Sequence, residues 1–232
     1  MVNTATAIIT PHTATRLEIP TGMPFQTFRE AFEAAAPVFD SVAIAAITAR
    51  GGSWDEVLAA VATNAPHGLM VFSSIDIAPL MAAAGHHNAA VQYLLGNHTV
   101  AERMYRHNPL AVLYAPLRVL VFADERGEAV FALDQPSTLF GSLADPRITA
   151  VGHELDAKVA ALLAAVGVDV GAALSPGEPP RTTTAQSGVA AQRPRPRAVT
   201  SVTPSARAVT SSRQAVSQDE QPIEVPTGRE TR

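Results

Sequence analysis

Arg118 is a single charge inside the most apolar stretch of the chain, which makes it the first candidate for chemistry. The residues around it favour a β-strand, where alternate side chains point to opposite faces, so Arg118 shares a face with Leu120 and Phe122. If that face is covered, the guanidinium must meet an anion, because an unpaired buried charge is strongly destabilising. Three arrangements are open: an ion pair with Asp134 or Glu102, contact with the anion of a ligand, or exposure to solvent.

The second candidate is the start of a predicted helix at residues 96–99, which read Gly-Asn-His-Thr. Free backbone amides and the positive end of the helix dipole favour an anion at such a place. Arg103 follows on the same helix and adds a cation. The predicted ligand contacts are therefore Asn97, His98 and Arg103, together with Arg118 and Asp134.

Thr99 and Glu102 have the spacing of a capping box, which occupies two of these amides and adds a negative charge. The same helix allows a metal alternative, because His98 and Glu102 are four residues apart and His86 or His87 could complete a two-histidine, one-carboxylate set. No HExxH motif supports that set.

The sequence lacks the usual signatures of catalysis. It contains no cysteine, no Walker loop, no GxGxxG after a strand and no GxSxG elbow. No catalytic residue, cofactor or metal is therefore predicted, and an enzyme is the less favoured class.

The elements that must position these residues follow from apolar spacing and turn residues. Phe25, Phe28 and Phe32 recur on one face of a helix, and Ser53 with Glu56 forms a capping box before another. Strands are predicted at residues 16–19, 69–75, 91–95, 111–123 and 128–133, and helices at residues 24–35, 37–50, 54–64, 78–84, 99–107 and 146–166.

This order of elements predicts an α+β fold, a mainly antiparallel sheet with helices packed on one face. Residues 1–15 are expected to be flexible, residues 16–174 to form the domain, and residues 175–232 to be a disordered tail rich in proline, serine, threonine and arginine. A hairpin is expected at residues 124–127. Pro116 should mark a strand start, a bulge or an edge, because it cannot donate a ladder hydrogen bond.

Charge is distributed unevenly along the chain. Residues 1–177 carry nine basic and sixteen acidic side chains, whereas the remainder carries eight arginines and five acids. Nucleic-acid binding is therefore not expected of the domain, and only weak binding could fall to the tail. No stretch suits a membrane span, and the first residues do not resemble a secretory signal, so a cytoplasmic protein is expected.

Three short motifs point to a known family: residues 94–97 read Leu-Leu-Gly-Asn, residues 114–121 read Tyr-Ala-Pro-Leu-Arg-Val-Leu-Val, and residues 134–136 read Asp-Gln-Pro. In these motifs the chain resembles the domain of unknown function 302 family. Its members typically show a strand ending in Gly-Asn-Pro, a helix, a Leu-Pro-x-Arg strand with a hairpin, and an Asp-Pro before the last helix. Here His98 replaces the usual proline, and Ala115 precedes Pro116.

The resemblance covers roughly residues 16 to 167 and implies a compact α+β domain, homodimers and no established activity. The residues that match the pattern are Asn97, Pro116, Arg118 and Asp134. The favoured function is a small-ligand-binding or sensor-like domain without catalysis, whose anionic or polar ligand contacts Arg118 and Asn97. The alternatives are a metal- or haem-assisted enzyme, and a structural or interaction module that acts through its tail.

Overall fold

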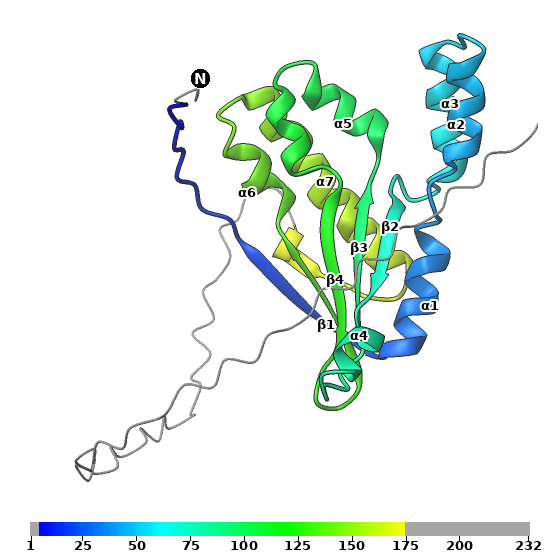
Figure 1. The fold of residues 1–232 in the computed structure, drawn as a ribbon, viewed down its shortest axis with the longest axis vertical. Coiled ribbons are helices and arrows are strands. Elements are labelled where there is room, and N and C mark those ends of the chain that lie inside the picture. Colours follow the sequence, from blue (N-terminus) through cyan, green and yellow to red (C-terminus); the bar gives the residue numbers. More distant parts are fainter. Residues whose placement is uncertain (1–4, 175–232) are drawn as a thin grey trace, which may run out of the picture. The chain divides into compact units, whose positions relative to one another are not determined.

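The computed structural model describes residues 5–174, which form one unit of mixed helices and strands (Figure 1). The predicted tail at residues 175–232 lies outside the described residues. The strands are β1 (Arg16–Pro24), β2 (Met70–Asp76), β3 (Ala90–Gly96), β4 (Leu117–Ala123) and β5 (Glu128–Asp134). The α-helices are α1 (Phe25–Ala35), α2 (Ser41–Ala49), α3 (Trp54–Asn64), α4 (Ala78–Ala82), α5 (His98–Tyr105), α6 (Pro136–Gly141) and α7 (Pro146–Ala165), and two 3-10 helices are η1 (Pro109–Leu113) and η2 (Gly171–Leu174).

The five strands form one sheet in the order β1-β5-β4-β3-β2, and every neighbouring pair is antiparallel. In the register, Val121 pairs with Val91 on one side and with Phe131 on the other. Because paired residues point to the same face, these three side chains lie together. The predicted α+β fold with an antiparallel sheet is confirmed.

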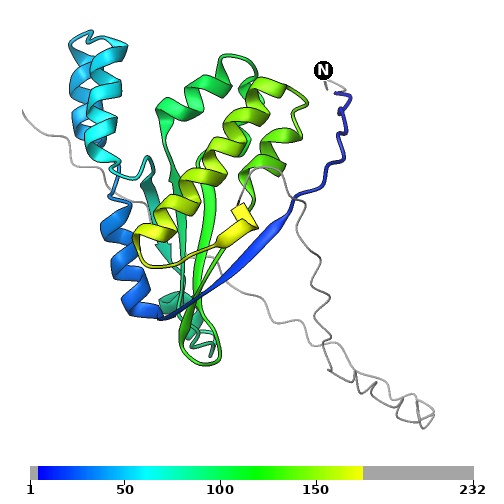
Figure 2. The same ribbon diagram turned by 180° about the vertical axis from the view of Figure 1, so that it is seen from behind.

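One face of the sheet is covered by α1 and α7, which Figure 2 shows crossing it. Phe28 and Phe32 of α1 are fully buried there, in a single cluster with the strand residues of that face. Their rings lie 6.0 Å apart, and Phe32 also meets Tyr93 edge to face at 5.1 Å. The predicted aromatic stripe of α1 is therefore core packing, and each ring contributes about 1.5–3 kcal/mol by leaving water.

Helix α7 is the longest element and begins where the sequence predicted. Asp145 caps it by accepting the backbone N–H of Arg147, and Pro146 takes the first helical position. Its buried side chains follow helical spacing: Ile148, Val151, Leu155, Val159 and Leu162. No helix in residues 5–174 is both long enough and apolar enough to cross a membrane.

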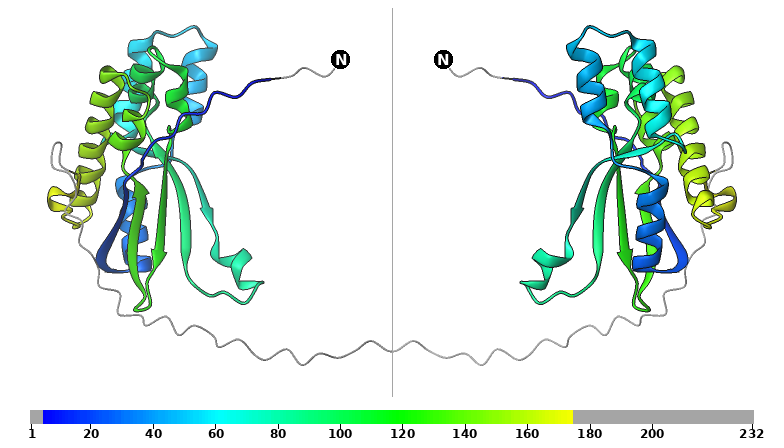
Figure 3. Two further views of the ribbon diagram at one scale, coloured as in Figure 1. Left: turned by 90° about the vertical axis from the view of Figure 1, so that its left-hand side faces the viewer. Right: turned by 90° about the vertical axis from the view of Figure 1, so that its right-hand side faces the viewer.

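The opposite face of the sheet is covered by no α-helix of the main core. Leu94, Leu120 and Phe122 point there and are only half-buried, and none of them belongs to a buried cluster of the described residues. Figure 3 shows the sheet from its two edges, with α7 on one side and α4 extending toward the other. The sheet therefore has a covered face and an open face.

A second, smaller core lies between α2, α3 and the start of β2. It contains Ile47, Val57, Val61, Ala65 and Met70. The predicted capping box of α3 is confirmed, since Ser53 accepts the backbone N–H of Glu56 and the Glu56 carboxylate accepts that of Ser53.

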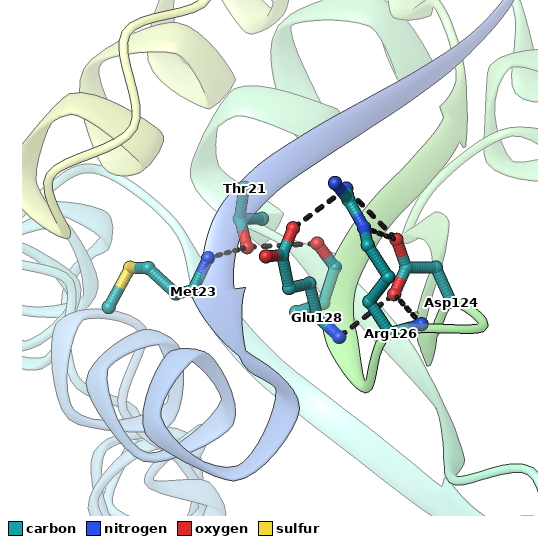
Figure 4. A network of polar contacts seen from close by, with 6 residues as sticks. Thr21, Met23, Asp124, Arg126 and Glu128 are labelled. Carbon is teal, nitrogen blue, oxygen red and sulfur yellow. Dashed lines mark hydrogen bonds and ion pairs between the residues drawn. The ribbon is translucent and has the colours of Figure 1, made fainter.

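The β4–β5 hairpin closes through a network of polar contacts shown in Figure 4. The Asp124 carboxylate accepts the backbone N–H groups of Arg126 and Glu128 at 2.8 and 2.9 Å. Gly127 takes a left-handed conformation with φ of 78°, which favours glycine. The Thr21 hydroxyl donates to the carbonyl of Ala129 at 2.8 Å and fixes the end of β1 against the hairpin. The predicted hairpin is confirmed.

Two local predictions are wrong. Residues 111–113 were expected to be strand, but they lie in η1, because Asn108 accepts the N–H of Leu110 and Pro109 suits a first helical position. The strand starts at Leu117, directly after Pro116, as the missing N–H of that proline predicted. The Thr99–Glu102 capping box is also wrong, because α5 begins at His98 and its cap is Asn97, two residues before Thr99.

Candidate ligand-binding site

An apolar cavity lies between α5, η1 and the adjoining ends of β3 and β4. It has a volume of about 270 Å³. Its lining is almost entirely apolar: Phe72, Gly96, Asn97, His98, Val100, Ala101, Met104, Val112, Ala115, Pro116, Leu117, Phe140 and Leu155. No charged side chain is in this set, so the cavity suits an uncharged molecule.

His98 is the ionisable side chain of the cavity lining. Both of its ring nitrogens are buried, and neither has a hydrogen-bond partner among the described residues. The ring lies edge to face against Phe39 at 5.2 Å and Phe72 at 6.1 Å between centroids. A buried polar group without a partner is rare in folded proteins and costs about 1–3 kcal/mol.

Burial lowers the pKa of the His98 imidazole from its ordinary value of 6.5. The cause is desolvation, which disfavours the charged form. His98 is therefore neutral at pH 7, with one nitrogen able to donate and the other able to accept a hydrogen bond.

Asn97 lies beside His98, but its amide is already engaged within the protein. Its Oδ1 accepts the N–H and hydroxyl of Thr99 at 2.9 and 2.7 Å, and its Nδ2 donates to the carbonyl of Gly68 at 3.1 Å. It therefore holds the start of α5 against the loop before β2. This capping also uses the amides that were expected to attract an anion.

The other predicted ligand contacts lie elsewhere. Arg118 is exposed on the open face of the sheet, whereas the cavity opens among residues that flank the covered face. Arg103 pairs with Glu154 at 2.6 Å on the surface. The structure thus places Asn97 and His98 together and does not bring Arg118, Arg103 or Asp134 to them.

The ion pair expected for Arg118 is absent from residues 5–174. The Asp134 carboxylate pairs with Arg16 at 2.9 Å, and Glu102 pairs with Arg106. Arg118 lies on the same face as Asp134, because the neighbouring pair Val119–Leu133 fixes their register. Of the three arrangements open to it, exposure is the one observed.

The metal alternative is not assembled. His86 and His87 are exposed before the start of β3, whereas His98 follows its end, so the length of a seven-residue strand separates them. That length is roughly 20 Å, far beyond the span of a metal site. No group of three potential metal ligands occurs within the described part of the chain.

Most of the cavity lining could not be found from sequence. Met104, Phe140 and Leu155 are ordinary apolar residues at helical positions, and nothing in their spacing distinguishes a cavity wall from a filled core. The local signal was at the start of α5, where Asn97 and His98 were predicted ligand contacts and both line the cavity.

Among solved structures, the chain is similar to the crystal structure of an uncharacterized conserved protein DUF302 from Bacillus stearothermophilus. The two share 14% sequence identity with a TM-score of 0.47, and the match covers 65% of this chain and 97% of that one. No curated protein matches the chain.

The model of the domain of unknown function DUF302 matches residues 46–166, which is more than half of the chain. The matched segment runs from the end of α2 through the last turn of α7, so it contains β2 to β5 and the whole cavity lining. The chain therefore belongs to the DUF302 family.

Proposed function

We propose that this domain binds a small, uncharged and largely apolar molecule in the cavity beside His98, and that it does so without catalysis. The observation that supports this most directly is the apolar cavity of about 270 Å³ with an unpartnered imidazole in its wall. A ligand with one hydroxyl or carbonyl group would give a ring nitrogen the partner it lacks, after a small rotation of the ring.

The expected ligand differs from the anion suggested by Arg118 and the helix start. The cavity lining contains no cation, and Asn97 already satisfies the first amides of α5. A buried anion without a counter-charge is strongly disfavoured. Val112 lines the cavity and is 51% exposed, so it marks the side from which a ligand would enter.

Three probes of one shape test the proposal: naphthalene, 2-naphthol and 2-naphthalenesulfonate. We expect 2-naphthol to bind most tightly, naphthalene about tenfold more weakly because it lacks one hydrogen bond, and the sulfonate not to bind. Binding is measured by the fluorescence of 2-naphthol and by calorimetry.

Two variants identify the site. Ala101→Trp fills the cavity and should abolish binding of 2-naphthol, whereas Ala150→Trp, on an exposed position of α7, should not. His98→Phe keeps the aromatic contacts with Phe39 and Phe72, and should remove only the preference for 2-naphthol over naphthalene. Unchanged binding in Ala101→Trp, or no binding by the wild type, would contradict the proposal.

A second proposal concerns association: the chain forms homodimers. What supports it is the open face of the sheet, where Leu120 and Phe122 are left half-exposed by the described residues. An antiparallel sheet that faces water ordinarily carries polar residues on that side. Leu120 and Phe122 depart from that pattern, and such half-exposed apolar side chains favour a protein partner.

A further inference from the structure

The residues before β1 run past α6 to Tyr114, which directly follows η1. Thr15 is fixed to the start of α6, where its N–H donates to Thr138 Oγ1 at 3.1 Å and its carbonyl accepts the N–H of Gln135 at 2.7 Å. Three residues earlier, His12 Nε2 lies 3.4 Å from the Tyr114 hydroxyl, and the two rings meet edge to face at 6.0 Å. Figure 1 shows this segment continuing from β1 along the side of the molecule that carries α6.

Tyr114 connects this segment to the cavity. Its ring packs edge to face against that of Phe140 at 5.9 Å, and Phe140 lines the cavity. On either side of Tyr114 along the chain, Val112 and Ala115 also line the cavity. His12 therefore holds the segment next to the side of the cavity at which Val112 is exposed.

Two isoleucines precede His12 and lie in water. Ile8 is 94% exposed and Ile9 is 85% exposed, and residues 5–11 make no hydrogen bond to any other residue in the described part of the chain. On η1, Leu113 is 72% exposed beside Val112. Exposed apolar side chains on both partners favour their burial against each other.

The isoleucines are close enough along the chain to reach η1. An extended chain advances by at most about 3.3–3.6 Å per residue, so Ile9 can lie up to roughly 10 Å from His12. Leu113 immediately precedes Tyr114, the residue that His12 contacts, so it lies within that reach. Pro11 fixes its own φ between Ile9 and His12, which reduces the conformational entropy lost when the segment moves onto η1.

Resting on the proposed ligand binding, we propose that residues 5–11 act as a strap that closes the mouth of the cavity when a ligand is bound. In the closed state Ile8 and Ile9 pack on Val112 and Leu113, while His12 stays against Tyr114 as the pivot. The structure, with both isoleucines in water, is the open state. Because closure shields the ligand from solvent, the strap slows its release.

The first test uses disulfide formation in the full chain, which contains no cysteine of its own. Ile9→Cys combined with Leu113→Cys should cross-link within one chain at least about tenfold faster when 2-naphthol is bound, because the ligand favours the closed state. The control pair is Ile9→Cys with Leu80→Cys, an exposed position on α4 at the other end of the sheet, and it should not cross-link within a chain. Non-reducing electrophoresis separates cross-links within a chain from those between chains.

The second test measures the release of 2-naphthol by stopped-flow dilution and its fluorescence. The Ile9–Leu113 disulfide should slow release at least about tenfold, and a reductant should restore the wild-type rate. Ile8→Asn with Ile9→Asn should release 2-naphthol about tenfold faster than the wild type. Ala5→Asn with Thr6→Asn, at exposed positions of the same segment, is the matched control and should leave the rate unchanged.

The outcomes separate the strap from the ligand binding on which it rests. Equal release rates in the wild type and the isoleucine variant, or equal cross-linking with and without 2-naphthol, would refute the strap and leave ligand binding intact. A disulfide that forms only between two chains would assign the exposed residues of η1 to another molecule and would also refute the strap. A wild type that does not bind 2-naphthol would refute the proposed function and the strap together.

Discussion

Both faces of the sheet carry apolar side chains from β4, but only one face buries them fully. On the covered face, Val119, Val121 and Phe131 are fully buried under α1 and α7. On the open face, Leu120 and Phe122 from the same strand remain half-buried beside the exposed Arg118. The alternation of side chains along a strand assigns residues to two faces, but it does not show which face is covered by helices of the same chain. A strand that is apolar on both faces needs a cover on both.

The largest difference between the faces should come from aromatic truncation. Phe131→Ala leaves a cavity in the core and should lower the free energy of unfolding by about 3–5 kcal/mol. Phe122→Ala, in the next row of the sheet, should cost less than about 1.5 kcal/mol in dilute protein, because its side chain is already partly in water. Urea denaturation at low protein concentration measures both. Equal costs would show that the open face is packed in the monomer.

Carboxylates provide the second contrast. Asp156 is fully buried behind the covered face and accepts hydrogen bonds from Gln135 Nε2 and the backbone N–H of Ser137, both at 3.0 Å. Asp156→Ala should cost about 2–3 kcal/mol, since it leaves two donors without a partner. Asp134→Ala on the open face should cost less than about 1 kcal/mol, because its pair with Arg16 is exposed to solvent. Thermal unfolding of dilute samples measures the stability loss of both variants. A larger loss for Asp134→Ala than for Asp156→Ala would contradict the prediction.

Close helix packing over the covered face can be tested with two glycines. A Cβ at Gly152 of α7 would lie 3.0 Å from the Cα of Ser137 and 3.2 Å from the Cβ of Phe140, whereas one at Gly141 would meet nothing nearer than 3.9 Å. We expect Gly152→Ala to destabilise the fold by about 1–2 kcal/mol through overpacking. Gly141→Ala is the control and should be neutral or slightly stabilising. A neutral Gly152→Ala would mean that α6 can move away from α7 at little cost.

The smallest expected effect concerns pH. Because burial lowers the pKa of His98, the unfolded chain takes up a proton at a higher pH than the folded chain does. The folded protein therefore keeps this part of its stability above about pH 6.5 and loses it as the pH falls below that value. Between about pH 7.5 and about pH 5, His98→Phe should lose less thermal stability than the wild type does, and the exposed control His87→Phe should behave as the wild type. Parallel curves for all three proteins would exclude His98 as the cause.

Much of the fold could be predicted from the sequence, because its elements have local signals. Asp145 with Pro146, Ser53 with Glu56, and Gly127 each define a boundary within a few residues of chain. Helix α6 was not predicted although Pro136 is its first residue, and the contact that holds its start, from the Ser137 backbone N–H to the Asp156 carboxylate on α7, is too distant in the chain to act as a local signal. The sequence suggested Thr99 as the N-cap of α5. Asn97 is the N-cap instead, because its side-chain amide bonds both to the start of α5 and to the carbonyl of Gly68.

The candidate site was only half predictable for a related reason. His98 and Asn97 were found because a polar pair next to a helix start is visible in the sequence. Arg118 was assigned to the same site because sequence distance does not reveal that the strand directs it away, to the opposite face from Leu117 and the cavity. The wall of the cavity consists of contacts between residues far apart in the chain, which no spacing rule encodes.

The edges of the sheet limit how this protein can associate. Beside β2, the backbone of Pro37 and Phe39 exchanges hydrogen bonds with both polar groups of Val71. On the other side, β1 carries Pro20 and Pro24, and its register shifts between them. Prolines and irregular register prevent a further strand from joining an edge. Growth of the sheet into a continuous, fibril-like ribbon by the addition of strands is thereby obstructed at both edges.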